Sequence, residues 1–372
     1  MGLLKILKTL ALVVAAVAVT IGVIGKVKPE LFLKFSPGFI LWAMTGHPVP
    51  PYIVQDAWQP GLVDTWLKDE DLVVASGAKS GTTWMLYCTH QIRTHGDEEN
   101  FPFEDPNINT PWMDLISTPG ANWATQLEKF NTTILPDGTP YREKWDHDDY
   151  PFRIFKSHFT PRTTGGTLPV KERPNVRFLA VARPGLDVFA SFVPFFNSHT
   201  DEWRAMWGGF PPRTSGDFEQ DKNARFEELM PGGLLSGLYF NYVNNWWPLR
   251  NEDNVMLLHY NDIKKDLTGT IAKIAKFVNI ELTEEELETI SQRCSFDHMK
   301  SQRAKFNYQL PLNPDFPGSA MVPGTLVNKG QAGRGKNIFS EEQKARYLEA
   351  EVAEFGHDQE LLEWIRHGTA GK

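Results

Sequence analysis

The chain has 372 residues and a formal net charge of −8, and 41% of its residues are hydrophobic. This length and composition permit a substantial buried core in one α/β domain, whereas the negative charge argues against a general nucleic-acid-binding protein. The only two cysteines, Cys88 and Cys294, form no disulfide framework and do not have the spacing of a zinc site.

The N-terminus carries an uncharged apolar run over residues 10–25, which follows Lys5 and Lys8. The run is somewhat shorter than the about 20 residues that a membrane-spanning helix needs, but neighbouring apolar residues lengthen it. We predict that residues 1–28 form a single-pass N-terminal membrane anchor, whose orientation across the membrane the flanking lysines do not decide. A cleaved signal peptide and an ordinary helix of a cytoplasmic protein are the alternatives.

Residues 29–54 are rich in proline and aromatic residues and are predicted to connect the anchor to one globular domain over residues 55–372. Within that domain, residues 97–150 are polar, proline-rich and irregular. A long segment of this kind between core elements often forms a lid or a wall of the substrate site.

Short Val-rich and apolar runs predict strands that are buried on both faces. The predicted strands cover residues 71–76, 153–158, 176–183 and 255–260. Helical patterns lie at residues 82–94, from 186 onwards, and at 234–250, 266–278, 283–294 and 341–355, with loop-like stretches at 200–233 and 301–338. Strands that alternate with helices indicate a single α/β domain with a P-loop-like central parallel β-sheet flanked by helices on both faces.

The most informative segment is residues 72–84, LVVASGAKSGTTW, in which an apolar strand runs through small residues into a helix. Backbone N–H groups and the positive end of the helix dipole would face an anion there, which predicts a phosphorylated nucleotide. A Walker A loop would place the lysine after the second glycine, but Lys79 precedes Gly81, and no magnesium-holding Asp is obvious. A nucleotide kinase or NTPase with a degenerate loop therefore stays an alternative.

Further motifs follow this loop in a fixed order. They are Lys156-Ser157-His158, Arg183 with Ser191 eight residues later, Tyr260-Asn261-Asp262, Ser295-Phe296 and Lys329-Gly330. Together with the loop, this set resembles the cytosolic-type sulfotransferase family over roughly residues 55–350. The resemblance implies transfer of a sulfuryl group from 3′-phosphoadenosine 5′-phosphosulfate (PAPS), without a metal, to a hydroxyl or amine of a small apolar acceptor.

The resemblance also implies the catalytic roles. His158 would take the proton of the acceptor, because an imidazole with a pKa near about 6.5 suits a base at neutral pH. Lys79 would neutralise the bridging oxygen of the leaving group, and Lys156 would help to stabilise the group in transfer. The 5′-phosphosulfate would be held by backbone N–H groups of Ser80, Gly81, Thr82 and Thr83.

For the nucleotide end of PAPS, the resemblance implies two further groups of residues. Arg183 and Ser191 would hold the 3′-phosphate, and Lys329 and the Gly330 N–H would close over it. The adenine would lie among Trp84, Tyr260, Cys294 and Phe296.

The chain departs from the family pattern in three places. Ala78 stands where the family often has proline, and the late loop has one cation fewer than usual, which Arg334 could replace. The usual dimer segment is not present at residues 337–344, so the oligomeric state stays open. A catalytically inactive, membrane-tethered binding protein is the remaining alternative, although Lys79 and His158 argue against it.

Overall fold

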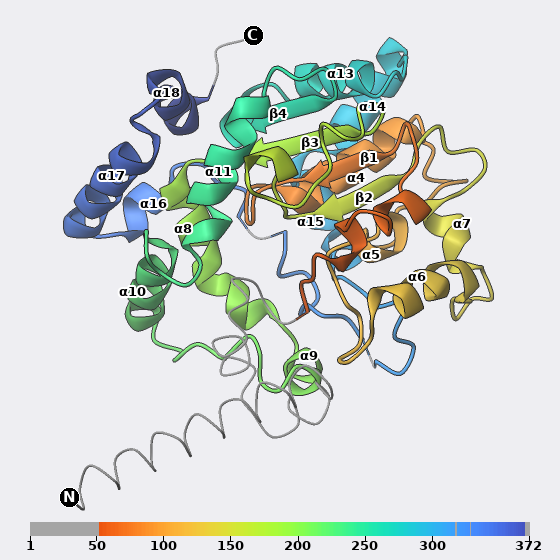
Figure 1. Cartoon of the computed structure of the whole chain (residues 1–372), viewed down its shortest axis with the longest axis horizontal. Helices are drawn as coiled ribbons and strands as arrows, with labels where there is room; N and C mark the ends of the chain where they lie inside the picture. The colour runs from red at the N-terminus through yellow and green to blue at the C-terminus, as the bar shows by residue number, and fades with distance from the viewer. Residues whose placement is uncertain (1–51, 317, 328, 369–372) are drawn as a thin grey trace, which may run out of the picture.

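The computed structural model describes residues 52–316, 318–327 and 329–368 (Figure 1). Among them, one sheet of four parallel strands has the order β2-β1-β3-β4. The strands are β1 Leu72–Ala75, β2 Ile154–Ser157, β3 Arg177–Ala182 and β4 Val255–His259. Each lies inside the run predicted for it, so the predicted parallel sheet is confirmed.

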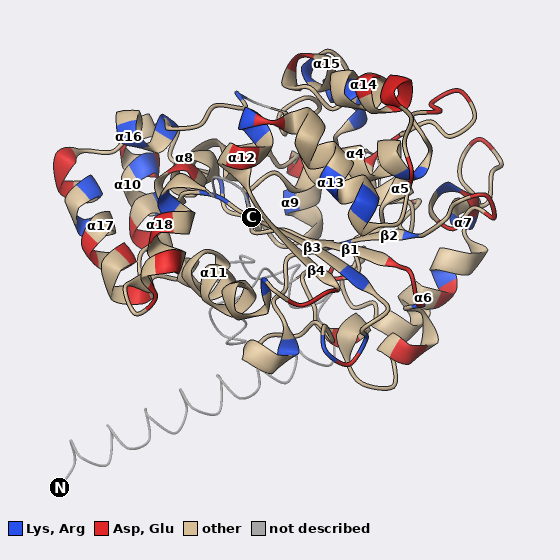
Figure 2. Ribbon diagram, turned by 90° about the horizontal axis from the view of Figure 1, so that it is seen from above, with Lys and Arg blue, Asp and Glu red and all other residues tan. Residues whose placement is uncertain are grey.

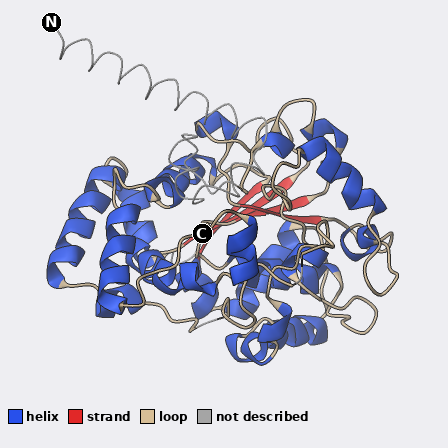
Figure 3. Ribbon diagram, turned by 90° about the horizontal axis from the view of Figure 1, so that it is seen from below, coloured by secondary structure: helices blue, strands red, loops and turns tan. Residues whose placement is uncertain are grey.

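Helices surround the sheet in the described part of the chain (Figure 3). They are α4 Thr82–Arg93, α5 Pro106–Asn109, α6 Trp123–Thr132, α7 Tyr141–Trp145, α8 Gly185–Phe195, α9 Asp201–Met206, α10 Phe218–Leu229, α11 Phe240–Trp246, α12 Tyr260–Lys265, α13 Leu267–Phe277, α14 Glu284–Arg293, α15 Phe296–Ser301, α16 Arg334–Ile338, α17 Glu341–Phe355 and α18 Gln359–His367. The helices predicted over 82–94, 266–278, 283–294 and 341–355 are therefore confirmed as α4, α13, α14 and α17.

Successive side chains of a strand point to opposite faces of the sheet, and helices cover both faces. Leu72 and Val74 belong to a buried cluster that includes residues of α4, α13 and α14. Val73 and Ala75 belong to a second cluster, which includes residues of α8 and α11. Figure 2 shows the sheet edge-on between α4 and α13 on one side and α11 on the other. The predicted α/β fold is thus confirmed.

Two predicted segments differ from the structure. Residues 234–250 are not one helix, since α11 lies between two short 3-10 turns, Ser236–Leu238 and Trp247–Leu249. Pro248 lies in the second turn, and a proline has no N–H to continue the helical hydrogen bonds.

The predicted loop at residues 200–233 was also wrong, because it contains α9 and α10. The Asp217 side chain caps α10 by accepting from the Gln220 N–H, and Lys222 pairs with Glu219 one turn before it. Charged residues with good helix propensity and a capping Asp stabilise such a surface helix without a strong apolar pattern.

The predicted membrane localisation needs correction. None of the helices in residues 52–316, 318–327 and 329–368 is long and apolar enough to cross a membrane. The predicted anchor, residues 1–28, and most of the predicted connector, residues 29–54, lie outside these described residues. The described helices thus include no membrane anchor, and the predicted membrane localisation is corrected on that finding.

Candidate active site

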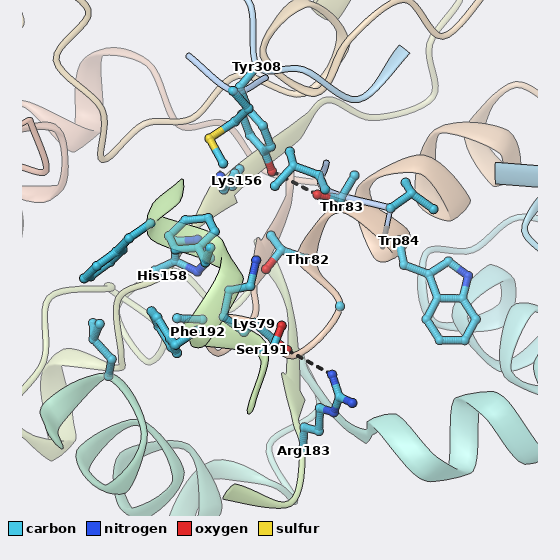
Figure 4. Close-up of a pocket in the computed structure, with 18 of the residues that line it drawn as sticks. Lys79, Thr82, Thr83, Trp84, Lys156, His158, Arg183, Ser191, Phe192 and Tyr308 are labelled. Atoms are coloured by element: carbon cyan, nitrogen blue, oxygen red, sulfur yellow. Dashed lines mark hydrogen bonds between the residues drawn. The ribbon is translucent and has the colours of Figure 1, made fainter. Parts of the chain in front are cut away.

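A cavity of about 320 Å³ opens at the carboxyl ends of the parallel strands, the edge where ligands bind in open α/β sheets (Figure 4). Each strand is followed by a residue that lines this cavity or by a loop that reaches it. The predicted site residues that line it are Lys79, Gly81, Thr82, Thr83, Trp84, Lys156, His158, Arg183, Ser191, Tyr260, Phe296, Lys329 and Gly330. Ser80 and Cys294 are not among the lining residues, and both are buried.

The loop after β1 is shaped for an anion. Gly81, the N-cap of α4, has a φ of 106°, and Lys79 has a φ of 61°, so the chain turns sharply before the helix. No side chain caps α4, which leaves its first N–H groups available to a ligand. The Ser76 hydroxyl donates to Thr82 Oγ1 at 2.6 Å and fixes the two ends of the loop together. This arrangement suits a phosphate or sulfate group.

The tautomer of His158 is fixed by the main chain. Its Nδ1 lies 2.8 Å from the Ser76 carbonyl oxygen, which can only accept, so Nδ1 carries the hydrogen and Nε2 is left as an acceptor. Burial and then the Lys156 charge lower the pKa of His158 from 6.5 to about 3. The imidazole is therefore neutral at physiological pH, as a general base must be before it takes a proton.

A residue that the sequence did not single out positions His158. The buried Asp114 carboxylate accepts from the His158 main-chain N–H at 2.7 Å and from the Ser157 hydroxyl at 2.9 Å. The Trp58 indole N–H donates to the same carboxylate at 2.8 Å. Through these hydrogen bonds, Asp114 holds the end of β2 against the chain segment to which Asp114 itself belongs.

Two lysine side chains enter the same space. Burial and then the Arg183 charge lower the pKa of Lys79 from 10.5 to about 7. The pKa of Lys156 is also well below its usual range, mainly because of burial, and its Nζ lies over the rings of Trp112 at 3.3 Å and Tyr308 at 3.9 Å. An anion bound beside these amines would favour their charged forms and raise both pKa values again.

The Arg183 guanidinium lies against the late loop. Its Nη2 donates a hydrogen bond to the Gln331 carbonyl oxygen at 2.7 Å, and Oδ2 of Asp187 lies 3.4 Å from the same nitrogen. The Asp187 carboxylate also accepts from the N–H groups of Gly333 and Gly335, and it thereby holds this loop against the start of α8. The buried Arg183 Nε has no partner among the described residues, so it is available to a ligand.

The rings predicted for the adenine form one side of the cavity. Trp84 and Tyr260 meet edge to face with centroids 5.6 Å apart, and Phe296 lies beside Gly330. The Trp84 indole N–H donates to the Cys294 carbonyl at 2.7 Å, so Cys294, which does not line the cavity, holds Trp84 through its main chain. Its thiol lies in the buried cluster beneath α4 instead.

Aromatic side chains line the opposite part of the cavity, and none of them was singled out from the sequence. This acceptor side consists of Tyr52, Trp112, Phe159, Phe192, Phe195, Phe196, His199, Trp203, Phe210 and Tyr308. The high aromatic content of residues 97–150 and 195–247 was the available signal, but it does not say which rings face the cavity. Figure 4 shows Phe192 and Tyr308 on the side where His158 lies, away from Trp84.

A glycine substitution tests whether the late loop must stay close to Phe296. Gly330 has a φ of 57°, and an added Cβ would collide with the Phe296 ring. We expect Gly330→Ala to weaken nucleotide binding by about tenfold, or about 1.4 kcal/mol, measured by calorimetric titration. Gly333→Ala is the matched control, because its φ of 76° carries similar strain and an added Cβ has nothing within 4 Å. Equal effects of the two variants would contradict the role of the Phe296 contact.

The sequence and the fold are similar to those of known proteins. A family model described as the sulfotransferase domain matches residues 69–353. Sulfotransferase 1B1 of Canis lupus familiaris is 24% identical over 329 residues, which cover 86% of this chain and 93% of the relative. Sulfotransferase 1A1 of the same species is 28% identical over 289 residues, with 77% and 83% covered.

Solved structures show the same fold at low sequence identity. Mouse sulfotransferase SULT7A1 complexed with PAP has a TM-score of 0.53 and 19% identity, and the match covers 83% of this chain and 93% of that one. Retinol dehydratase in complex with androsterone and inactive cofactor PAP has a TM-score of 0.52 and 21% identity, with 83% and 84% covered. The enzyme class predicted from the sequence, a PAPS-dependent sulfotransferase, is confirmed by the family match. The chain belongs to the sulfotransferase family.

Proposed function

We propose that this enzyme transfers the sulfuryl group of PAPS to a hydroxyl or amine of a small apolar acceptor, with His158 as the general base and Lys79 at the leaving group. One observation carries the proposal. A single cavity joins a cationic side, with Lys79 and Arg183, to an aromatic side, and the neutral His158 lies in its lining.

The residues present fit PAPS. The uncapped start of α4 offers N–H donors to the 5′ end, and the unpartnered Arg183 Nε offers a donor to the 3′-phosphate. Ser191 and Lys329 line the same cavity and are proposed to add a hydroxyl and a charge there. When bound, PAPS supplies the electrophilic sulfuryl group and a good leaving group.

The chain's own residues are proposed to divide the remaining work. His158 Nε2 accepts the proton as the acceptor oxygen or nitrogen becomes bonded to sulfur. The Lys79 ammonium stabilises negative charge on the departing oxygen, and the α4 N–H groups orient the group that is transferred. Asp114 keeps His158 in place through its main chain.

The aromatic side supports an apolar acceptor. Rings dominate the lining between Phe192 and Phe210, and such surfaces bind flat or extended apolar molecules. Neighbours of the same fold are described in complexes with androsterone and with retinol, both of which are apolar alcohols. We therefore infer that phenols, sterols or retinoid-like alcohols are better acceptors than sugars.

The test is a sulfate-transfer assay on the purified full chain. PAPS labelled in its sulfuryl group is offered with phenols, sterols, retinoids, amines and sugars, in the presence of a metal chelator. We expect label on apolar hydroxyl or amine compounds and little on sugars. In a parallel reaction with ATP and Mg²⁺ and without the chelator, phosphorylation in the absence of any sulfate transfer would support the kinase alternative. Tight PAP binding without any transfer would support an inactive binding protein.

Replacing Arg183 tests the nucleotide end of the site. We expect Arg183→Ala to weaken PAP binding by about 10–100-fold, because a hydrogen bond to a charged group is worth about 1.5–3 kcal/mol. Calorimetric titration measures the change. Arg177→Ala is the control, since Arg177 begins the same strand at its other end and pairs with Glu70. Unchanged PAP affinity in Arg183→Ala would remove Arg183 from the proposed site.

A further inference from the structure

The acceptor side of the cavity contains a second imidazole. His199 follows the short 3-10 turn Phe196–Ser198, is 5% exposed and lines the cavity. Its Nδ1 lies 3.3 Å from the Phe196 carbonyl oxygen, so Nδ1 carries the hydrogen and Nε2 is an acceptor. Burial and then the Arg204 charge lower the pKa of His199 from 6.5 to about 3, which keeps this ring neutral.

The main chain around His199 is firmly held. The buried Arg204 guanidinium donates to the carbonyl groups of Phe196, His199 and Pro211. The His199 ring packs edge to face on Phe195, with centroids 5.0 Å apart. A ring held by main-chain and aromatic contacts presents its nitrogen in one defined direction, as a selective site requires.

His199 Nε2 lacks a donor among residues 52–316, 318–327 and 329–368. The rings of Phe195 and Trp203 pack beside it, and the Phe195 carbonyl and the Lys79 charge also act on the imidazole. A hydrogen-bond acceptor among apolar rings is poorly satisfied unless a ligand supplies a donor. The same nitrogen would disfavour the lone pairs of an ether or a carbonyl, because the neutral ring has no hydrogen at Nε2.

We propose that His199 selects acceptors that carry a second hydrogen-bond donor, an O–H or N–H, besides the group that receives sulfate. This inference rests on the proposed function and adds a substrate class to it: diphenols, diols and aminophenols. In such an acceptor, one hydroxyl gives its proton to His158, while the other donates a hydrogen bond to His199.

Matched pairs of acceptors test this selection. Hydroquinone and 4,4′-dihydroxybiphenyl are compared with their monomethyl ethers, which keep the size and one phenol but lose the second donor. For the diphenol that fits the site better, we expect kcat/KM to be about tenfold higher than for its monomethyl ether. This ratio is well above the factor of about two that arises because a diphenol has two equivalent hydroxyl groups. In His199→Phe, which keeps a flat ring without nitrogen, the ratio is expected to fall to about two.

The control variant is His357→Phe, in the exposed turn between α17 and α18, which is expected to keep the wild-type ratio. His199→Gln, which restores an acceptor oxygen, is expected to recover part of the preference. A ratio of about two in the wild-type enzyme, or a tenfold ratio that survives in His199→Phe, would overturn the inference while leaving the proposed function intact.

Binding separates this inference from the proposed function. Calorimetric titration of the PAP-bound protein with each diphenol and its ether gives the same comparison without turnover. If no acceptor is sulfated but the diphenol binds more tightly by a margin that His199→Phe removes, the proposed function fails and the role of His199 stands. Equal binding of both members of every pair overturns the role of His199.

Discussion

Replacing His158 with alanine is expected to lower kcat by about 10²–10⁴-fold, the usual contribution of a general base. The reason is geometric. Nδ1 donates to the Ser76 carbonyl, so Nε2 is the only nitrogen of the ring that can take the acceptor's proton. Affinity for PAP should change little, because His158 lies at the end of β2 rather than in the loop before α4.

The measurement is steady-state sulfate transfer together with calorimetric titration of PAP. His357→Ala, a substitution at an exposed turn, controls for the loss of an imidazole elsewhere. A His158→Ala variant that retains most of its kcat would show that another group, or solvent, accepts the proton. Loss of PAP binding in the same variant would indicate a structural role for His158.

The pH dependence of His158 gives an independent check. Since the pKa of His158 is lowered to about 3, the ring stays neutral as the pH falls from 8 to 5 and becomes protonated only near pH 3. We therefore expect no acid limb near pH 6.5 in the rate measured with both PAPS and acceptor well below saturation, which reports the free enzyme. A limb near 6.5 that disappears in His158→Ala would show that the buried ring titrates normally.

Replacing Lys79 with methionine is expected to lower kcat by about 10²–10³-fold. This is the usual effect of removing one preorganised group with which an enzyme stabilises charge in a transition state. Methionine keeps most of the apolar stem but removes the ammonium group, whose Nζ lies 4.0 Å from the centre of the Phe195 ring in the wild-type protein. Lys273→Met, at an exposed position of α13, is the matched control. Full activity of Lys79→Met would exclude Lys79 from the chemical step.

Lys79 should also couple PAP binding to pH. Burial and Arg183 lower its pKa to about 7, so at pH 8 most Lys79 side chains are neutral in the free enzyme. A bound anion favours the ammonium form, and binding should therefore take up a proton and weaken as the pH rises above 7. Titrations at pH 8 in buffers of different ionisation enthalpy should reveal this uptake in the wild type and not in Lys79→Met.

The sequence predicted the elements whose signals are local. Four short apolar runs gave the four strands of the sheet, and the glycine and hydroxyl residues after the first run marked the loop before α4. The resemblance to the sulfotransferase family implied that Lys79, His158 and Arg183 meet around one nucleotide, and Arg183 ends a predicted strand, at the edge where ligands bind in open α/β sheets. The structure brings Lys79, His158 and Arg183 to the lining of one cavity.

Helix boundaries with weaker local signals were predicted less well. Pro248 and Asp217 each carry a local signal, a break and a cap, which the predicted helix over 234–250 and the predicted loop over 200–233 do not take into account. The N-terminal run was interpreted from hydropathy alone, and the localisation that it suggested has been corrected. Composition over a window is a weaker guide than a capping residue or a proline at one position.

Only the tertiary structure decided which distant segments complete the site. Asp114 supports His158 from 44 residues away, and Asp187 holds Gly335 across 148 residues. The assignment of His199 to the acceptor side likewise depends on packing around Arg204. By itself, the sequence determined the sheet and the loop before α4, since these follow from local pattern and chain order, and the proposed chemical groups came from its resemblance to a known family. The acceptor side depended on long-range packing of aromatic rings, for which a single sequence carries no positional signal.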